Sequence, residues 1–486
     1  MSLIRQNKIQ DGVNDSLLME VNSSLQAEVH DTDTLAKLVE LLAKNTEILA
    51  DTTAILAKNT EIEANQTDKT QMTQITDGTD EVVVNTNGSI NVETDTARGA
   101  FGEQLSANLY PQYQGTFEYT VGNTELNTNT EVNGGTVTQG SGMCVVSTST
   151  TTASTAEFKS KRHARYRAGL GGLQRFTALF TTPVAATEQL VGLADETGSS
   201  EAYKNGYMIG YIGTVFGYHR YQNDVLTTVP IAQWDDPLDG TGASGTTIDQ
   251  TKLGVWAIQF QYLGAGAVKI CFENPATGNL DVVHVDQYAN ANIVPSTFNP
   301  NFHFTIWTDN KATTTDLILK SASYAYFIEG MTSNIELHQP QFNTDELSKS
   351  TVTTEVAIFT IRNKSTYQSK TNYVDLMLEN FTGSIEAASA NNLGDVRLVK
   401  DATLGGSPSY ADINTSDSVV DIDVAGTTVT GGKTLITIPL AGKNDRAFEN
   451  LVDYKILIGP GETVTLAGTS GNSATINGAL LWKELV

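Results

Sequence analysis

The sequence has 486 residues and a mass of 52.2 kDa, which predicts two or three domains that each bury an apolar core. Charged residues make up only 17% of the chain, and abundant Gly, Thr, Asn and Ser are typical of turn-rich β structure. With 55 acidic and 30 basic residues the formal charge is −25, which disfavours nucleic acid as a partner because phosphate contacts dominate that kind of binding.

The first residues, MSLIRQNKIQDG, lack the continuous apolar core of a signal peptide, and no long apolar stretch predicts a membrane span. We therefore expect a soluble protein that is made in a cytoplasm and does not insert into membranes. Residues 1–34 are interpreted as an N-terminal anchoring segment. Within it Leu18, Val21 and Leu25 follow a heptad frame of their own, and the run HDTDT at 30–34 predicts a break before the next helix.

Residues 35–63 predict a short coiled coil. The segment LLAKNTEI at 41–48 returns as ILAKNTEI at 55–62, an offset of two heptads. Amides in a coiled-coil layer lower stability but fix register and helix number, so we expect a homotrimer. The alternative is an amphipathic helix packed on the body of a monomer. The predicted trimer core consists of Leu35, Leu38, Leu42, Asn45, Leu49, Thr52, Leu56 and Asn59.

The repeated Leu-x-x-Asn-Thr units at 42–46 and 56–60 resemble the apolar-x-x-Asn-Thr heptads of trimeric autotransporter adhesin stalks and phage fibres. The resemblance implies three chains whose Asn side chains point to a common axis, where they can hold an anion. This sequence departs from the pattern by using Leu rather than Ile or Val at position a, and by having Thr52 at the middle d position.

Residues 64–98 are dominated by Thr, Asn, Asp and Gly and predict a linker or neck. A short apolar run at 82–84 followed by Asn87-Gly88 predicts one hairpin within it.

Residues 99–341 predict a central antiparallel β-sandwich of jelly-roll type, because short apolar and aromatic runs alternate with Gly, Asn, Asp and Pro turns. Cys144 and Cys271 lie far apart and are expected to be buried apolar residues rather than a disulfide or a zinc site. The glycines of GYIGTVFGY, at 210–218, are expected at bulges or close backbone approaches. Strands are predicted at 116–121, 143–147, 176–180, 207–211, 215–221, 255–262, 268–272, 280–285, 302–307 and 322–328.

One dense basic cluster stands out in this acidic chain. Alternate residues from position 159 to position 167 are expected to share one face of a strand. The cluster predicts a docking strip for an acidic neighbour, either another subunit or another virion protein; the alternative is a solvated edge strand whose charges prevent aggregation. Its residues are Lys159, Lys161, Arg162, Arg165 and Arg167.

Several short motifs of the central region, taken together, resemble a domain of structural proteins from tailed bacteriophages and some large DNA viruses. They are YRAGLG at 166–171, RFTALF at 175–180, GYIGTVFG at 210–217, QYLG at 261–264 and the stretch from His284 to Asn290. The resemblance implies a virion component and carries no catalytic residues.

Three carboxylates follow a tryptophan in WDDPLDGTG, an arrangement that suits contact with a sugar or its cleavage. The alternative is a turn-rich loop whose aspartates accept hydrogen bonds from nearby backbone amides. The possible glycan contacts are Trp234, Asp235, Asp236 and Asp239.

Residues 345–486 predict a second, smaller β-sandwich, and Pro460-Gly461 predicts a type II turn within it. The joint between the sandwiches is expected in HQPQFNTDELSKS, at 338–350. Strands are predicted at 356–362, 373–378, 396–399, 419–424, 434–439, 454–458, 463–467 and 479–484.

No histidine pair has metal-ligand spacing, and no nucleotide-binding or hydrolase motif occurs, so neither a metal, a cofactor nor an enzyme is expected. The chain is interpreted as a homotrimeric virion structural protein, a fibre, baseplate or capsid-attached component, that serves assembly and attachment to a host surface. Its expected partners are itself, other virion proteins and a host glycan or receptor. The alternatives are a polysaccharide-degrading tailspike, which would use the carboxylates after Trp234, and a lectin-like glycan-binding module.

Overall fold

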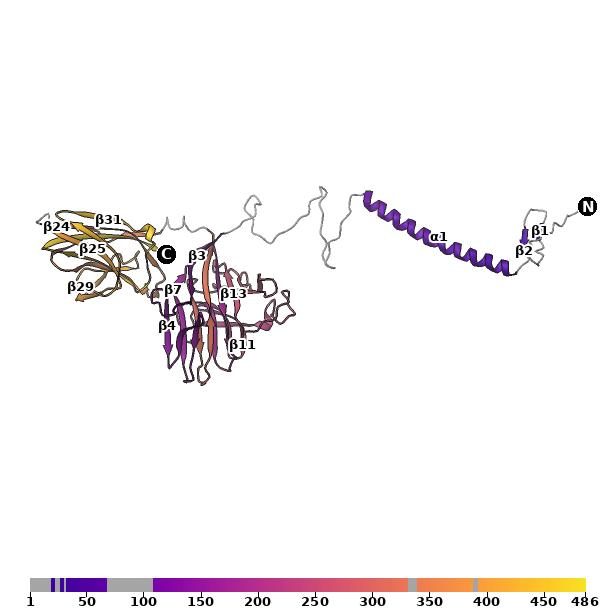
Figure 1. Cartoon of the computed structure of the whole chain (residues 1–486), viewed down its shortest axis with the longest axis horizontal. Helices are drawn as coiled ribbons and strands as arrows, with labels where there is room; N and C mark the ends of the chain where they lie inside the picture. The colour runs from indigo at the N-terminus through magenta and orange to yellow at the C-terminus, as the bar shows by residue number, and fades with distance from the viewer. Residues whose placement is uncertain (1–18, 22–26, 30–31, 68–107, 331–338, 388–391) are drawn as a thin grey trace, which may run out of the picture. The chain divides into compact units, whose positions relative to one another are not determined.

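The computed structural model describes residues 19–21, 27–29, 32–67, 108–330, 339–387 and 392–486. The chain divides into two compact units, Met1–Leu105 and Ser106–Val486. The described part is mainly β, with one long helix in the first unit and antiparallel sheets that form two sandwiches in the second (Figure 1). The predicted fold class, mainly β with an N-terminal helix and antiparallel sandwiches, is thereby confirmed.

In the first unit, β1 (Met19–Val21) pairs with β2 (Ala27–Val29) and precedes α1 (Thr32–Thr67). The separate heptad frame predicted through Val21 is wrong, because this residue belongs to a strand. The helix begins inside the expected break and continues past residue 63, where the coiled coil was expected to end. The hairpin predicted at Asn87-Gly88 lies outside the described residues.

The central sandwich consists of two large sheets and a small one, all antiparallel. In sheet order, the seven-stranded sheet contains β12 (Val225–Pro230), β11 (Val215–Gln222), β10 (Gly206–Ile212), β9 (Glu188–Ala194), β16 (Phe302–Asp309), β7 (Thr155–Ala164) and β4 (Asn127–Val132). The six-stranded sheet contains β15 (Leu280–Asp286), β14 (Val268–Glu273), β13 (Gly254–Phe260), β8 (Gly171–Ala178), β18 (Ser323–Glu329) and β3 (Leu109–Thr116). The small sheet contains β17 (Ile318–Ser321), β6 (Met143–Ser147) and β5 (Thr136–Gly140).

The core of this sandwich lies between the two large sheets and is rich in aromatic rings. Phe304 of β16 stacks on Tyr324 of β18 with ring centroids 4.4 Å apart, so one ring from each sheet meets in the middle. Phe158 of β7 and Trp256 of β13 belong to the same buried cluster. Large rings that bury fully contribute most of the apolar stabilisation of such a core.

The glycines of the β10–β11 hairpin have the role expected from the sequence. A Cβ at Gly210 would collide with the carbonyl oxygen of Gln189 on the adjacent strand β9, and the backbone of Gly210 has φ +148°. Gly213, with φ +60°, lies in the turn between β10 and β11. Both positions therefore need the conformational freedom of glycine.

The C-terminal sandwich is built from two six-stranded antiparallel sheets. The first contains β19 (Gln341–Asn343), β34 (Ala474–Leu485), β24 (Asp375–Ala387) and β31 (Arg446–Asn450), with β20 (Leu347–Val352) on β34 and β32 (Leu457–Ile458) on β24. The second contains β27 (Tyr410–Asp412), β28 (Val420–Asp423), β21 (Val356–Asn363), β33 (Thr463–Ser470), β25 (Leu393–Lys400) and β30 (Lys433–Ala441). Two two-stranded sheets complete this part: β22 (Thr366–Tyr367) pairs with β23 (Lys370–Thr371), and β26 (Thr403–Gly406) pairs with β29 (Gly426–Thr430).

The first and last strands of this sandwich pair with each other, because β19 lies against β34. The sandwich therefore begins at Gln341 rather than at residue 345. The predicted turn at Pro460-Gly461 is confirmed: the amide of Glu462 donates to the carbonyl oxygen of Gly459 at 3.1 Å, and Gly461 has φ +84°.

Candidate functional site

The predicted trimer core follows one stripe of α1. Its leucines are between 50% and 68% exposed, and Ile48 and Ile55 beside them are 61% and 60% exposed. Each such side chain gains about 1.5–3 kcal/mol when it is fully buried, so the stripe is a surface suited to a partner helix. The leucines are Leu35, Leu38, Leu42, Leu49 and Leu56.

The polar positions of this stripe are satisfied in different ways. The hydroxyl of Thr52 donates to the carbonyl oxygen of Ile48 at 2.6 Å, so it needs no partner from another helix. The side chains of Asn45 and Asn59 are exposed, and their amides bond to none of the described residues. The side-chain amides of Asn45 and Asn59 are therefore available for pairing across a helical interface. The hydroxyl of Thr52, in the layer between them, already has a hydrogen-bond acceptor within its own helix.

The predicted docking strip begins on β7, which lies between β16 and β4 and is therefore not an edge strand. The alternative of a solvated edge is wrong for this reason. The expected single strand face is wrong as well, because the pairing of β7 with β16 shifts register between Lys159 and His163 and β7 ends at Ala164. Lys159 turns to its own sandwich and donates to the carbonyl oxygen of Asp195 at 2.9 Å.

Two residues of the strip form ion pairs with the C-terminal sandwich of the same chain. Nζ of Lys161 lies 2.6 Å from Oε1 of Glu462, and Arg165 donates to Oδ2 of Asp375 at 2.6 Å. The acidic neighbour that the strip contacts in this structure is thus a domain of its own chain. Docking to another subunit or another virion protein stays a prediction.

The other two arginines of the strip reach backbone atoms of the C-terminal sandwich. Arg162 donates to the carbonyl oxygen of Leu457, and Arg167 to that of Val486, both at 3.3 Å. Four of the five predicted docking residues therefore lie where the two sandwiches meet. We call this region, formed by residues 161–167 and the parts of the C-terminal sandwich that they contact, the junction.

Charge pairing at the junction is strong enough to keep a buried carboxyl ionised. Burial by itself raises the pKa of Asp375, but interactions with His163, Arg165 and Arg162 more than offset it, and the pKa lies below its ordinary value. A group that is buried in this way is destabilising unless its partner remains in place. The junction therefore depends on the Arg165–Asp375 pair.

A second carboxyl at the junction is shared between two lysines. Glu462 lies 2.6 Å from Lys161 and 2.8 Å from Lys400, and Lys400 in turn lies 2.9 Å from Glu125 of the central sandwich. Burial raises the pKa of Glu462, but hydrogen bonds from Lys161 and Lys400 outweigh it and lower the pKa. The result is a chain of alternating charges that crosses the junction.

The possible glycan contacts lie in the loop after β12 and the short 3₁₀ helix η1 (Ile231–Gln233). Trp234 is only 4% exposed, and its Nε1 donates to the carbonyl oxygen of Val229 at 3.0 Å. Its ring is stacked with His284, with ring centroids 6.0 Å apart, and stands edge-on to Trp256. This ring packs in the core and does not present a face to a sugar.

The three carboxylates of this loop hold the backbone in place. Asp236 accepts from the amides of Leu238 at 3.0 Å and Ser244 at 2.7 Å, and Asp239 accepts from the amide of Thr241 at 2.9 Å. Asp235 accepts from the amide of Val285 at 2.8 Å. This geometry favours the alternative weighed for the segment, a loop stabilised by its aspartates.

The same hydrogen bonds set the acidity of two of these groups. Burial raises the pKa of Asp236, but bonds from Ser244 and Leu238 outweigh it and lower the pKa. Bonds from the hydroxyl and amide of Thr241 lower the pKa of Asp239. A general acid for glycoside cleavage needs a raised pKa, so neither group suits that task.

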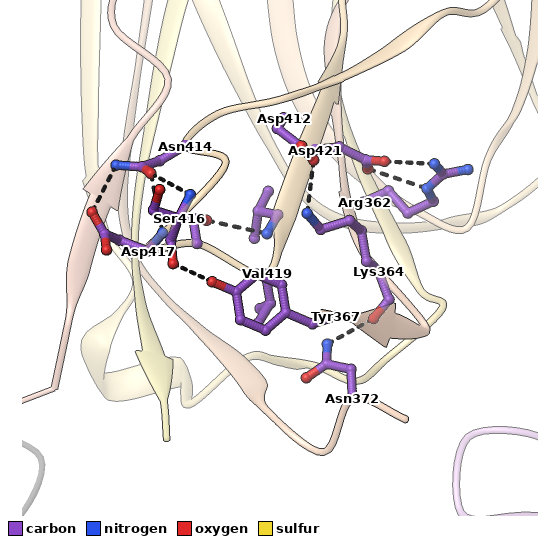
Figure 2. Close-up of polar contacts among 12 residues, drawn as sticks. Arg362, Lys364, Tyr367, Asn372, Asp412, Asn414, Ser416, Asp417, Val419 and Asp421 are labelled. Atoms are coloured by element: carbon purple, nitrogen blue, oxygen red, sulfur yellow. Dashed lines mark hydrogen bonds and ion pairs between the residues drawn. The ribbon is translucent and has the colours of Figure 1, made fainter. Parts of the chain in front are cut away.

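Sequence reasoning missed a polar cluster in the C-terminal sandwich, shown in Figure 2. The guanidinium of Arg362 faces the carboxylate of Asp421 on the neighbouring strand β28, with bonds of 3.1 and 2.5 Å (Figure 2). Arg362 also lies over the ring of Tyr410, 4.0 Å from its centroid. The alternating aspartates of β28, Asp421 and Asp423, were the available signal, but the pairing of this strand with β21 could not be known from the sequence.

The rest of this cluster ties the loop after β27 to the end of β21. Lys364 lies 2.7 Å from Asp412, and the hydroxyl of Tyr367 donates to the carbonyl oxygen of Ser416 (Figure 2). Asn414 closes the loop by accepting from the amide of Ser416 at 2.9 Å. These side chains bond to one another and to the loop backbone, so the cluster stabilises this part of the fold.

A cleft of about 650 Å³ lies in the central sandwich beside the end of β3. Tyr119 is 89% exposed at its rim. Its polar lining includes Arg175, Gln114 and Asn123, and its apolar lining includes Phe117 and Tyr324. An exposed ring beside amides, hydroxyls and a cation is the set of groups that binds a polar ring-shaped ligand such as a sugar. Other polar lining residues are Thr116, Thr120, Thr177 and Ser323.

Among the described residues, no group of three or more His, Cys, Asp or Glu side chains is placed to hold a metal ion. Within the same part of the chain, α1 and the other helices are too short or too polar to cross a membrane.

No model of a known protein family matches this sequence, and no curated protein sequence matches it. Solved structures do show similar folds. Peanut lectin with a nine-residue peptide is 12% identical, with 46% of this chain and 99% of that chain covered and a TM-score of 0.29. Arcelin-5, a lectin-like defence protein from Phaseolus vulgaris, is 7% identical, with 45% and 99% covered and a TM-score of 0.29.

A third similar structure is Rv0315, an immunostimulatory antigen and pseudo β-1,3-glucanase of Mycobacterium tuberculosis. It is 9% identical, with 45% of this chain and 98% of that chain covered and a TM-score of 0.31.

Proposed function

We propose that this protein is a homotrimeric attachment protein without catalytic activity, in which α1 joins three chains and the central sandwich binds a glycan. The observation that carries the proposal is the apolar stripe of α1, whose leucines are between 50% and 68% exposed in the single chain. A helix of 36 residues with such a stripe is stabilised by other helices that cover it.

The occupant of this stripe is a second and a third copy of the same chain. The stripe repeats every seven residues, as the packing of parallel identical helices requires, and its free amides, Asn45 and Asn59, lie two heptads apart. In a symmetric bundle each amide meets its own counterpart, so identical copies satisfy one another in register. A different partner would need matching amides at both layers.

Attachment to a glycan is supported by the cleft beside Tyr119. Its volume of about 650 Å³ falls within the range of roughly 300–1,000 Å³ typical of small-molecule sites. Binding of a sugar-sized ligand to one such site is weak, and three sites on one trimer would raise the overall affinity by avidity. This is the way in which trimer formation and binding would work together.

A place in a virion, as a fibre, baseplate or capsid-attached component, is the further part of the proposal. Its support is the resemblance of residues 166–171, 175–180 and 210–217 to virion proteins. The absence of catalysis is supported by the loop after η1, where hydrogen bonds hold the carboxyls of Asp236 and Asp239 in their ionised form.

The oligomeric part is tested by the solution mass of the full chain. We expect three times 52.2 kDa for the wild type and for Ala54→Asp, which adds a charge on the side of α1 opposite the stripe. Leu49→Asp adds the same charge within the stripe and is expected to give monomers at micromolar concentration. A wild-type monomer, or equal masses for the two variants, would contradict the trimer.

The binding part is tested by screening the trimer against immobilised glycans. Tyr119→Ala is expected to lower binding at least tenfold. Phe448→Ala removes a ring that is 64% exposed on the C-terminal sandwich and serves as the matched control. Equal binding by both variants would remove the cleft from the proposal, and binding to no glycan would remove the ligand class.

A further inference from the structure

The junction contains a second cavity, of about 660 Å³, that the proposed function does not use. One wall comes from the central sandwich, with Arg162 and Arg165 after the β7 bulge and Gln112 on β3. The other comes from the C-terminal sandwich, with Asp375 of β24, Asp453 of η3 (Val452–Tyr454) and Lys455 just after it. Both walls belong to the same compact unit, Ser106–Val486.

Two cations in this cavity, Arg162 and Lys455, are not held in a close ion pair by the described residues, although Arg162 lies near enough to Asp375 to lower its pKa. Among the described residues, neither Arg162 nor Lys455 forms an ion pair, and Arg162 makes a single bond of 3.3 Å to a backbone oxygen. Nε of Arg165 is also buried without a hydrogen-bond partner in that part of the chain. The lining holds three cations, Arg162, Arg165 and Lys455, against two carboxylates, Asp375 and Asp453, and this excess of positive charge suits an anion.

The other residues that line the cavity indicate what else the anionic ligand contains. Tyr110, Met377, Leu457 and Leu485 supply apolar wall, which a bare inorganic ion does not need. Asp453 is exposed and can accept hydrogen bonds from hydroxyl groups. A ligand that satisfies all three features carries a carboxylate, several hydroxyls and an apolar ring face.

We propose that the junction cavity binds an acidic monosaccharide unit, with its carboxylate between Arg162 and Lys455 and its hydroxyls toward Asp453 and Gln112. The planar guanidinium of Arg162 matches a carboxylate in a two-point contact, and Lys455 adds a second charge. The site is separate from the Tyr119 cleft. Its failure would leave the trimer and the glycan cleft of the proposed function untouched.

The test uses the full-length protein and isothermal titration with three probes: glucuronate, glucose and inorganic phosphate. We expect glucuronate to bind in the millimolar range and at least tenfold more tightly than either glucose or phosphate. Lys455→Gln and Arg162→Gln are each expected to weaken glucuronate binding at least tenfold. Lys269→Gln, which changes an exposed lysine of β14 outside the cavity, is expected to bind as the wild type does.

Three results would overturn the assignment. Equal binding of glucose would remove the role of the carboxylate, and equal binding of phosphate would reduce the cavity to a simple anion site. Unchanged glucuronate affinity in Lys455→Gln would place the ligand elsewhere. Because Lys455 is exposed and makes no ion pair with the described residues, its variant tests the site even if Arg162→Gln disturbs the contact with Leu457.

Discussion

Arg165 and Asp375 are 210 positions apart in the sequence and meet in a buried contact of 2.6 Å between the two sandwiches. Neither side chain has access to enough water to replace its partner, since only 11% and 6% of their side-chain surfaces are exposed. The two sandwiches therefore depend on this ion pair to stay together, and each of its two charges can be removed separately by substitution.

Asp375→Asn is expected to destabilise the protein by about 3–5 kcal/mol, because it leaves the Arg165 guanidinium buried without a counter-charge. The double variant Arg165→Met, Asp375→Leu is expected to cost much less, since it removes both charges and keeps the volume filled. Urea unfolding of Arg165→Met, of Asp375→Leu and of the double variant measures the coupling. Additive losses would show that the two groups do not interact.

Stability of the central sandwich is expected to fall between pH 7 and pH 5. Burial lowers the pKa of His219 to about 4 and that of His303 to about 3. Each imidazole is therefore neutral when folded at pH 5, whereas the unfolded chain, with a pKa of about 6.5, takes up a proton. The unfolded state is favoured as the pH falls through 6.5, by about 2 kcal/mol per histidine at pH 5.

The contribution of His219 to the loss of stability between pH 7 and pH 5 can be measured by substituting it. His219 contacts Oγ1 of Thr228 at 3.1 Å and the carbonyl oxygen of Gly210 at 3.0 Å. His219→Gln keeps a polar group there but does not titrate, so its stability loss between pH 7 and pH 5 is expected to be smaller by about 2 kcal/mol. Urea unfolding at both pH values gives the comparison, and an unchanged loss would rule out His219 as a contributor.

Gly210→Ala is expected to destabilise the central sandwich by more than about 2 kcal/mol, because the added methyl group meets the carbonyl oxygen of Gln189 and the backbone has φ +148°. Gly140→Ala is the matched control: only a methyl group of Val145, at 3.6 Å, lies near the added atom. Thermal unfolding of both variants checks the difference. Similar melting temperatures would mean that β9 and β10 can separate at little cost.

The loop after η1 is expected to lose order when its buried carboxylate is removed. Asp236→Ala leaves the amides of Leu238 and Ser244 without their acceptor, at a cost of about 1–3 kcal/mol. Asp239→Ala, at an exposed position, is expected to cost clearly less than Asp236→Ala. Urea unfolding compares the two, and amide exchange at Ser244 reports whether the loop opens locally. Equal costs would mean that burial of Asp236 has no energetic role.

Several strands with an apolar rhythm could be predicted from the sequence, although the apolar strand β9 was missed, and polar strands could not. The prediction at 143–147 coincides with β6, and that at 268–272 lies within β14, since both consist of alternating or continuous apolar residues. β4, with the sequence NTNTEV, was missed because its side chains resemble those of a loop. The strand predicted at 116–121 is wrong. β3 ends at Thr116, and residues 117–121 of that prediction lie in a segment of bends.

The candidate site shows the same limit in another form. The basic strip could be recognised because its charges are consecutive, but its partners could not, since Asp375 and Glu462 carry no local signal that points to residues 161–165. Trp234 has the sequence context of a sugar contact, and only the fold shows that its ring packs against Trp256. The partners of the strip and the packing of Trp234 both depend on contacts between segments that are distant in the chain, and such contacts cannot be predicted from a single sequence.

The two cysteines have a practical consequence. Both thiols are buried and free, and burial raises the pKa of each, that of Cys271 to about 11. The thiolate is the reactive form of cysteine, so the two native cysteines are expected not to react with maleimide reagents under mild conditions. A single cysteine engineered on each sandwich could then carry a dye pair, and energy transfer between the dyes would report in real time on whether the two domains separate.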